Sequence, residues 1–96
     1  MVTSVDVGRK DDSGKLRFDL LPFAQVSEVV AVLTAGAKRY GDDNWKQVPN
    51  AKSRYLAALL RHVFAYAQGE RLDPDDGLSH LAHAVCCALF LMWFEE

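Results

Sequence analysis

Apolar side chains recur at helical spacing in three stretches of the chain, and this spacing predicts three helices. The stretches cover residues 22–40, 50–68 and 78–94. Pro22 suits the first turn of the first helix, because a proline lacks the backbone N–H that would be unpaired there. Asn50 suits the N-cap of the second helix, where its side chain can accept a backbone hydrogen bond. Glycines follow the first two helices and favour their ending there.

The residues before the first helix have a different pattern. Residues 1–14 are largely polar and are predicted to be flexible. In residues 15–21, charged and apolar side chains alternate, which is the period of an extended segment with one packed face. We therefore expect an N-terminal arm, and two interpretations of it are open. The arm either lays its apolar side chains on the helices and presents Lys15 and Arg17, or it is a tether with solvated charges.

The predicted helix 78–94 is apolar almost all round, and this limits the possible architecture. Three helices of this size cannot cover every side of it, so we expect a second copy of the chain to cover the rest. The predicted fold class is all-α: a small bundle of about three main helices with an extended N-terminal arm, completed by homo-oligomerisation through the last helix. A single helical domain, residues 15–96, follows the flexible segment 1–14.

Composition narrows the classes of function. The chain has 96 residues and a formal net charge of -2, which argues against general nucleic-acid binding because that needs a strong basic excess. Cys86 and Cys87 are neighbours in an apolar helix, a poor disulfide framework that suits a reducing compartment. The longest apolar run, residues 85–94, is too short for a bilayer, which takes about 20 residues. We expect a cytoplasmic protein with no membrane partner.

Most side chains that carry chemistry lie in residues 54–83. Arg54, Arg61 and His62 lie on the second predicted helix, opposite its apolar face. An acidic turn, residues 69–77, comes next, and all three histidines of the chain fall in this stretch. The turn's carboxylates belong to Glu70, Asp73, Asp75 and Asp76. Basic groups, imidazoles and carboxylates brought together in this way can hold a phosphorylated ligand, with or without a metal ion.

The histidines and the acidic turn each allow two interpretations. His80 and His83 are three residues apart, so they share one face of the last helix and can ligate a metal ion. They can equally be hydrogen-bonded histidines at a helix interface. No four ligands with zinc-finger spacing are present, whereas Mg²⁺ prefers carboxylates such as those of the turn. Asp75 and Asp76 can instead serve only to stabilise the N-terminus of the last helix.

Trp45 stands in the polar loop between the first two predicted helices and also allows two interpretations. It can pack the loop onto the helices, or it can offer a surface on which a base stacks. Asn44 can hold the loop or read a base edge. The chain has neither a G-x-x-x-x-G-K-[ST] loop nor a G-x-G-x-x-G motif, so phosphate binding must come from basic side chains and helix termini.

Several motifs occur in an order that resembles a known family. They are Lys15-Leu16-Arg17-Phe18-Asp19-Leu20-Leu21-Pro22, Gly36-Ala37-Lys38-Arg39-Tyr40-Gly41, Asn44-Trp45, Ala58-Leu59-Leu60-Arg61-His62, Gly69-Glu70, Asp73, Gly77 and His80-Leu81. Over residues 15–93 the chain is similar to the N-terminal domain of the phage dATP/dGTP diphosphohydrolases, a MazG-like group. The resemblance implies an α-helical phage protein, located in the host cytoplasm. It further implies that the domain 15–96 is a nucleotide-binding domain for purine deoxynucleoside triphosphates. It also implies hydrolysis of a dNTP to dNMP and pyrophosphate with a divalent cation.

The metal ligands cannot be carried over from the better-characterised MazG-like enzymes. Those enzymes have a glutamate-rich E-E-x-x-E helix, and the helices here have only Glu28 in such a place. We therefore predict the site from the residues of this chain. The predicted ligands of a divalent cation, Mg²⁺ or Mn²⁺, are Glu70, Asp73, Asp76 and His80. The predicted catalytic residues are His62, Glu70 and Asp73. The predicted nucleotide- and phosphate-binding residues are Lys15, Arg17, Lys38, Tyr40, Asn44, Trp45, Arg54, Arg61, His62 and His80.

Three classes of function compete. The leading hypothesis is a metal-dependent pyrophosphohydrolase of dNTPs, with dATP and dGTP as substrates. The alternative is a non-catalytic phage sponge with an anti-defence role, which sequesters a nucleotide second messenger of host immunity such as a cyclic dinucleotide. A pocket rich in basic side chains, with few carboxylates on helices, favours this alternative. The third class is a structural or regulatory helical oligomer.

Overall fold

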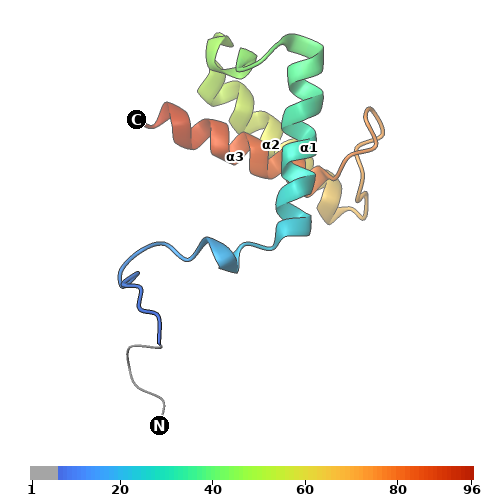
Figure 1. Cartoon of the computed structure of the whole chain (residues 1–96). Helices are drawn as coiled ribbons and strands as arrows, with labels where there is room; N and C mark the ends of the chain where they lie inside the picture. Colours follow the sequence, from blue (N-terminus) through green and yellow to red (C-terminus); the bar gives the residue numbers. More distant parts are fainter. Residues whose placement is uncertain (1–6) are drawn as a thin grey trace.

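The chain folds around one apolar helix that contacts both of the others. In a computed structural model, which describes residues 7–96, α3 packs along α2 and crosses α1 (Figure 1). The helices are α1, Phe23–Tyr40; α2, Ala51–Ala67; and α3, His80–Phe94; two short 3-10 segments are η2, Phe18–Leu20, and η3, Asn44–Gln47. The described residues form no sheet, and the only pairing of extended residues among them is one isolated bridge. The predicted all-α class with three main helices is confirmed.

Small side chains let α3 approach its neighbours closely. The buried apolar residues of the described chain are Ala51, Ala82, Ala84, Cys86 and Cys87. The Cys86 thiol lies 3.5 Å from the carbonyl oxygen of Val29, to which it donates a weak hydrogen bond across to α1. Burial raises the pKa of the Cys86 thiol to about 11, so it stays protonated and unreactive at neutral pH. This pair of cysteines therefore has a packing role.

Aromatic side chains fix the loop between α1 and α2 onto the C-terminal half of α3. The ring of Trp45 stacks on Phe90, with centroids 4.3 Å apart and planes 14° from parallel. The rings of Trp93 and Phe94 lie edge-on to the Trp45 ring, with centroids 5.3 and 6.1 Å from its centroid. Such contacts contribute about 0.5–1.5 kcal/mol each beyond the area they bury. Of the two interpretations of Trp45, packing of the loop is the one visible in these contacts.

The ends of the helices differ from the prediction in small, explicable ways. Asn50 does precede α2, but its φ of 55° is left-handed and its side chain makes no capping bond. The last helix was expected to begin at Leu78, whereas α3 begins at His80. Ser79 is its N-cap and accepts a hydrogen bond from the backbone N–H of Ala82 at 3.1 Å. The two residues before α3 belong to the turn instead. The carbonyl of Leu78 accepts from the N–H of Asp73, and Ser79 forms the isolated bridge with Leu72.

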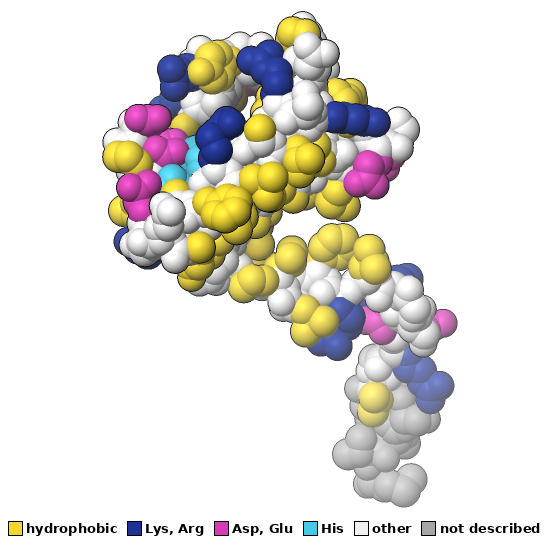
Figure 2. Space-filling model, turned by 180° about the vertical axis from the view of Figure 1, so that it is seen from behind, with side chains coloured by type: hydrophobic (Ala, Val, Ile, Leu, Met, Phe, Trp, Pro, Cys, Tyr) yellow, Lys and Arg dark blue, Asp and Glu magenta, His cyan; other side chains and the backbone are white. Residues whose placement is uncertain are grey.

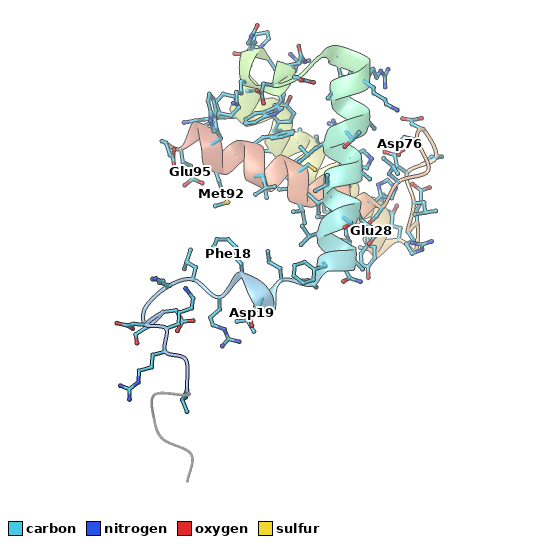
Figure 3. The ribbon with its side chains drawn as sticks, viewed as in Figure 1. Phe18, Asp19, Glu28, Asp76, Met92 and Glu95 are labelled. Atoms are coloured by element: carbon cyan, nitrogen blue, oxygen red, sulfur yellow. The ribbon has the colours of Figure 1, made fainter. Side chains whose placement is uncertain are left out.

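The arm before α1 leaves the helices rather than lying on them. Leu16 is 80% exposed and Phe18 is 68% exposed, and Figure 3 shows Phe18 and Asp19 well apart from α3. The interpretation in which the arm packs on the helices of its own chain is therefore wrong for this structure. Residues 1–6 of the predicted flexible segment lie outside the described residues.

The helices leave a large apolar surface uncovered, as the stripe across the body of the molecule in Figure 2 shows. Ten large apolar side chains of α2 and α3 are between 39% and 64% exposed. They are Leu56, Leu60, Val63, Phe64, Tyr66, Leu81, Val85, Leu89, Met92 and Trp93. Within residues 7–96, no helix combines the length and hydrophobicity that crossing a membrane requires.

We expect Ser79→Ala to lower the free energy of unfolding by about 1 kcal/mol, because the first turn of α3 loses its capping oxygen. Denaturant unfolding followed by circular dichroism measures this loss. Ser27→Ala is the matched control: Ser27 is exposed within α1, where alanine is the better helix former. A Ser79→Ala protein as stable as the wild type would contradict the assigned cap.

Candidate functional site

A tight turn between α2 and α3 brings acidic side chains next to the histidines. The turn closes through a bridge between Leu72 and Ser79, and the N–H of Asp73 donates to the carbonyl of Leu78 at 2.8 Å. The N–H of His80 donates to the carbonyl of Arg71 at 3.0 Å. The sequence favours this geometry because Gly77 adopts a φ of 71°, which a side chain would strain.

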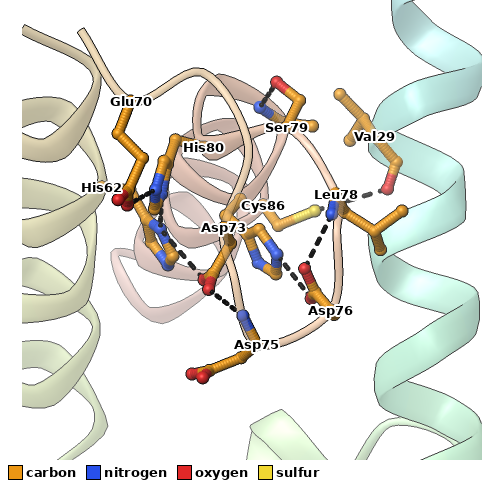
Figure 4. A network of polar contacts seen from close by, with 12 residues as sticks. Val29, His62, Glu70, Asp73, Asp75, Asp76, Leu78, Ser79, His80 and Cys86 are labelled. Atoms are coloured by element: carbon orange, nitrogen blue, oxygen red, sulfur yellow. Dashed lines mark hydrogen bonds and ion pairs between the residues drawn. The ribbon is translucent and has the colours of Figure 1, made fainter.

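Backbone N–H groups fix one oxygen of each of two aspartates in this turn. Oδ1 of Asp73 accepts from the N–H of Asp75, and Oδ1 of Asp76 accepts from the N–H of Leu78, both at 2.9 Å. The second oxygen of each faces an imidazole (Figure 4). Oδ2 of Asp73 lies 3.9 Å from Nδ1 of His62. These acids hold the turn and face the histidines, so they do more than stabilise the start of α3.

His80 connects the turn, α2 and α3. It is 5% exposed, and its Nε2 lies 2.7 Å from Oε1 of Glu70. Because a carboxylate only accepts, Nε2 carries the proton and donates it. The lone pair of Nδ1 then points at Nδ1 of His62, 2.9 Å away. Glu70 thereby fixes both the tautomer and the orientation of the imidazole.

His83 has a close neighbour without a hydrogen bond. Its Nε2 lies 2.7 Å from Oδ2 of Asp76, yet this buried nitrogen has no partner in hydrogen-bond geometry. The two atoms are close, but the nitrogen and the oxygen are not aligned for an ordinary hydrogen bond. The ring of His83 stacks on that of His62 at 4.6 Å and 8°. A buried nitrogen of this kind costs free energy unless something else satisfies it.

His62 is held mainly as a neutral imidazole. Burial lowers its pKa, and the charges of His83, His80 and Arg61 lower it further. Asp73 acts in the opposite direction but lies 3.9 Å away, so it does not outweigh them. A neutral imidazole has a lone pair available for a metal ion.

The donor atoms form two overlapping groups of three. In each group the atoms lie within 4.8 Å of one another: His62, Asp73 and His80 make the first, and Asp73, Asp76 and His83 make the second. Among the predicted ligands, Asp73 therefore lies with His80 in the first group and with Asp76 in the second. Glu70 contacts the far nitrogen of His80 and belongs to neither group. His83 was absent from the predicted ligands, although its spacing from His80 had placed both on one face.

A cavity of about 660 Å³ lies between α2 and the preceding loop. None of the cluster's histidines or aspartates lines it, and Arg61, which does, precedes His62 in the chain. Four of the predicted nucleotide-binding residues line it, namely Tyr40, Asn44, Arg54 and Arg61. Figure 2 shows Lys and Arg side chains next to the histidines and carboxylates on this side of the molecule. Arg54 donates to the carbonyl of Pro49 at 3.3 Å, while Arg61 has no ion-pair partner among residues 7–96.

A second cavity, of about 770 Å³, lies between α1, the loop that follows it and α3, and it reaches the second group. Asp76 and His83 line it, together with Trp45 and residues of α1. Tyr40, Asn44 and Tyr55 line both cavities.

The structure does not bring every predicted phosphate-binding residue to these cavities. Lys38 lines neither of them. Arg17 forms a bidentate pair with Asp19 in the arm, at 2.9 and 2.7 Å. Lys15 precedes it on the same arm, which extends away from the helices (Figure 1). Phosphate binding by Lys15, Arg17 and Lys38 at the cavities of their own chain stays a prediction that this geometry does not support.

Comparison with known proteins agrees with the motifs. The sequence matches the family model described as dATP/dGTP diphosphohydrolase, N-terminal, over residues 6–96. The chain belongs to this family. It is 35% identical over 86 residues to a dATP/dGTP diphosphohydrolase of Salmonella phage PMBT28, and the match covers 90% of this chain and 29% of that protein. The chain thus spans less than a third of this relative's length. No solved structure matches it.

We expect the metal-free protein to lose stability as the pH falls below about 6.5. The unfolded chain takes up a proton on His62 near that ordinary value, whereas the lowered pKa of the folded state resists it. The unfolded state then binds more protons, so the free energy of unfolding decreases with decreasing pH.

Urea unfolding in EDTA between pH 7.5 and 5.5 measures this effect. His62→Gln is the comparison, because it removes this imidazole and keeps the other titrating groups. Its free energy of unfolding should decrease less over the same pH range. Equal slopes for the two proteins would show that His62 is not held neutral.

Proposed function

We propose that this domain hydrolyses purine deoxynucleoside triphosphates, dATP and dGTP, to dNMP and pyrophosphate. Water adds to the α-phosphorus, the bond to the bridging α–β oxygen breaks, and pyrophosphate leaves. Family membership and the name of the phage relative support this reaction class. The observation that carries the proposal is that two consecutive residues of α2 belong to two different sites. Arg61 lines a cavity large enough for a nucleotide, and its neighbour His62 belongs to the histidine–aspartate cluster.

Arg54 and Arg61 are the groups that bind the phosphates in this proposal. They are seven residues apart on α2, hence two turns apart on one side of the helix, and both line the cavity. Charge-assisted hydrogen bonds to phosphate contribute about 1.5–3 kcal/mol each. Asn44 and Tyr40 lie at the same cavity and are available for the base and sugar.

The cluster fits a divalent cation by its chemistry. His62 and His80 present ring nitrogens and Asp73 presents an oxygen that no backbone N–H holds, so these three residues would hold the ion. When bound, it would supply a positive charge that stabilises the charge developing on the phosphate oxygens. The half-exposed carboxylate of Glu70 contacts His80 through one oxygen. Its other oxygen is the acceptor that we assign to the proton of the attacking water.

The proposal is tested by incubating the protein with dATP and dGTP in Mg²⁺ or Mn²⁺ and measuring pyrophosphate. We expect release by the wild type, none in EDTA, and a decrease of at least 100-fold for Asp73→Asn with little change in melting temperature. Asp75→Asn is the control in the same turn, since its side chain is in neither group. Ligand recovered intact after denaturation would replace hydrolysis by sequestration, and the absence of binding would refute both.

We expect Arg61→Ala to weaken nucleotide binding about tenfold or more, because one charge-assisted phosphate contact is lost. Titration calorimetry with a non-hydrolysable dATP analogue measures the affinity. Lys52→Ala is the matched control, since it removes an exposed cation from the same helix outside the cavity. Equal affinities for wild type and Arg61→Ala, with the fold intact, would remove Arg61 from the site.

We also propose that the domain forms a homo-oligomer through α3. Leu89 and Met92, near the end of this helix, are 44% and 60% exposed, and neighbouring apolar side chains make this surface continuous with α2 (Figure 2). Contiguous apolar surface of this extent is usual at interfaces between chains. A second copy presents the same surface, so a two-fold arrangement covers both.

Light scattering at micromolar concentration should therefore give a mass above that of one chain. Leu89→Glu should shift the protein toward the monomer, because it places a charge in the interface. Gln68→Glu adds the same charge at an exposed position at the end of α2 and should not. A monomeric wild type would end this proposal.

A further inference from the structure

The two groups of metal-binding atoms share one residue. Asp73 belongs with His62 and His80 on one side and with Asp76 and His83 on the other. Its side chain is only 15% exposed, and a backbone N–H fixes its orientation through Oδ1. Its carboxylate is therefore held in place near both sets of donor atoms.

The first set has two imidazole nitrogens that face each other. Glu70 accepts a hydrogen bond from Nε2 of His80, so Nδ1 of His80 carries a lone pair, 2.9 Å from Nδ1 of His62. Without a metal ion, a proton on Nδ1 of His62 makes this contact a hydrogen bond. A cation that displaced this proton would have both nitrogens available as ligands. Two nitrogens each about 2.1 Å from one ion lie roughly 3 Å apart when their bonds meet near a right angle. The separation thus suits two ligands of one ion.

The second set has a buried nitrogen without a hydrogen bond. Nε2 of His83 is buried and unpaired, although Oδ2 of Asp76 is 2.7 Å away. Oδ1 of Asp76 is occupied by the N–H of Leu78, which leaves Oδ2 for another partner. A nitrogen and an oxygen that are close but not aligned with each other are placed as two ligands of one cation are.

We propose that the cluster binds two divalent transition-metal ions, with Asp73 as the ligand that they share. His62 and His80 complete the first site, and Asp76 and His83 complete the second. Three imidazoles among five ligands select ions such as Mn²⁺, Co²⁺ or Zn²⁺ over Mg²⁺, which prefers oxygen. This inference deepens the proposed hydrolysis and rests on it only for the use of the ions. Two-ion sites with shared carboxylates are suited to displacement at phosphorus.

Mn²⁺ binding to the EDTA-stripped, dialysed protein tests the proposal without any turnover. Titration calorimetry should give two ions per chain, and the electron paramagnetic resonance spectrum should show an exchange-coupled pair. A large excess of Mg²⁺ should not displace them. His83→Gln should bind one ion and lose the coupling, and Asp73→Asn should weaken both sites at least tenfold. Asp75→Asn, the control in the same turn, should still bind two.

Asp76→Asn is the second variant for the case that His83→Gln does not fold. It keeps the oxygen that accepts from Leu78, and its circular dichroism spectrum shows whether the fold is intact. The proposal would be overturned if the wild type bound one uncoupled ion or none. It would also be overturned if His83→Gln still bound two ions. Pyrophosphate release with one bound ion would leave the proposed function standing. Two coupled ions without any release would leave the metal centre standing and refute the function.

Discussion

The burial of His80 at the first turn of α3 is the constraint on which the site depends. A polar ring that is 5% exposed needs partners at both nitrogens. Glu70 from the turn and His62 from α2 are those partners, at 2.7 and 2.9 Å. The residue therefore fixes the turn and α2 relative to α3 with one side chain. Small residues farther along α3 let the helices approach closely enough for these distances to be met.

The same constraint sets the electrostatics. Three imidazoles and two aspartates share one partly buried volume, so protonating all the rings would place several positive charges within about 5 Å of one another. Burial and the neighbouring rings lower the pKa of His62, and its neutral form is the one that binds metal. In the proposed metal centre, protons and metal ions would compete for the same lone pairs, so metal binding should depend on pH.

The sequence predicts the three helices well because their apolar spacing is local information. It also predicts that the acidic turn and the histidines are neighbours, since both lie in one short segment. It does not reveal that Glu70 serves His80 while Asp73 faces both groups, because these roles depend on which oxygen a backbone N–H holds. The pairing of His83 with Asp76 likewise depends on the path of the turn. The position of the arm is set by contacts that the alternation of its side chains does not specify.

Because the core is small, an ion bound at this cluster would matter for folding as well as for the proposed chemistry. Among residues 7–96 the buried apolar side chains are alanines and cysteines, which remove little surface from water compared with leucine or phenylalanine. An ion that binds only the folded state adds stability by mass action, about 2.7 kcal/mol at a hundred times its dissociation constant. Because its ligands come from α2, the turn and α3, such an ion would link these three segments. The stability of this domain and the occupancy of its site should therefore rise and fall together.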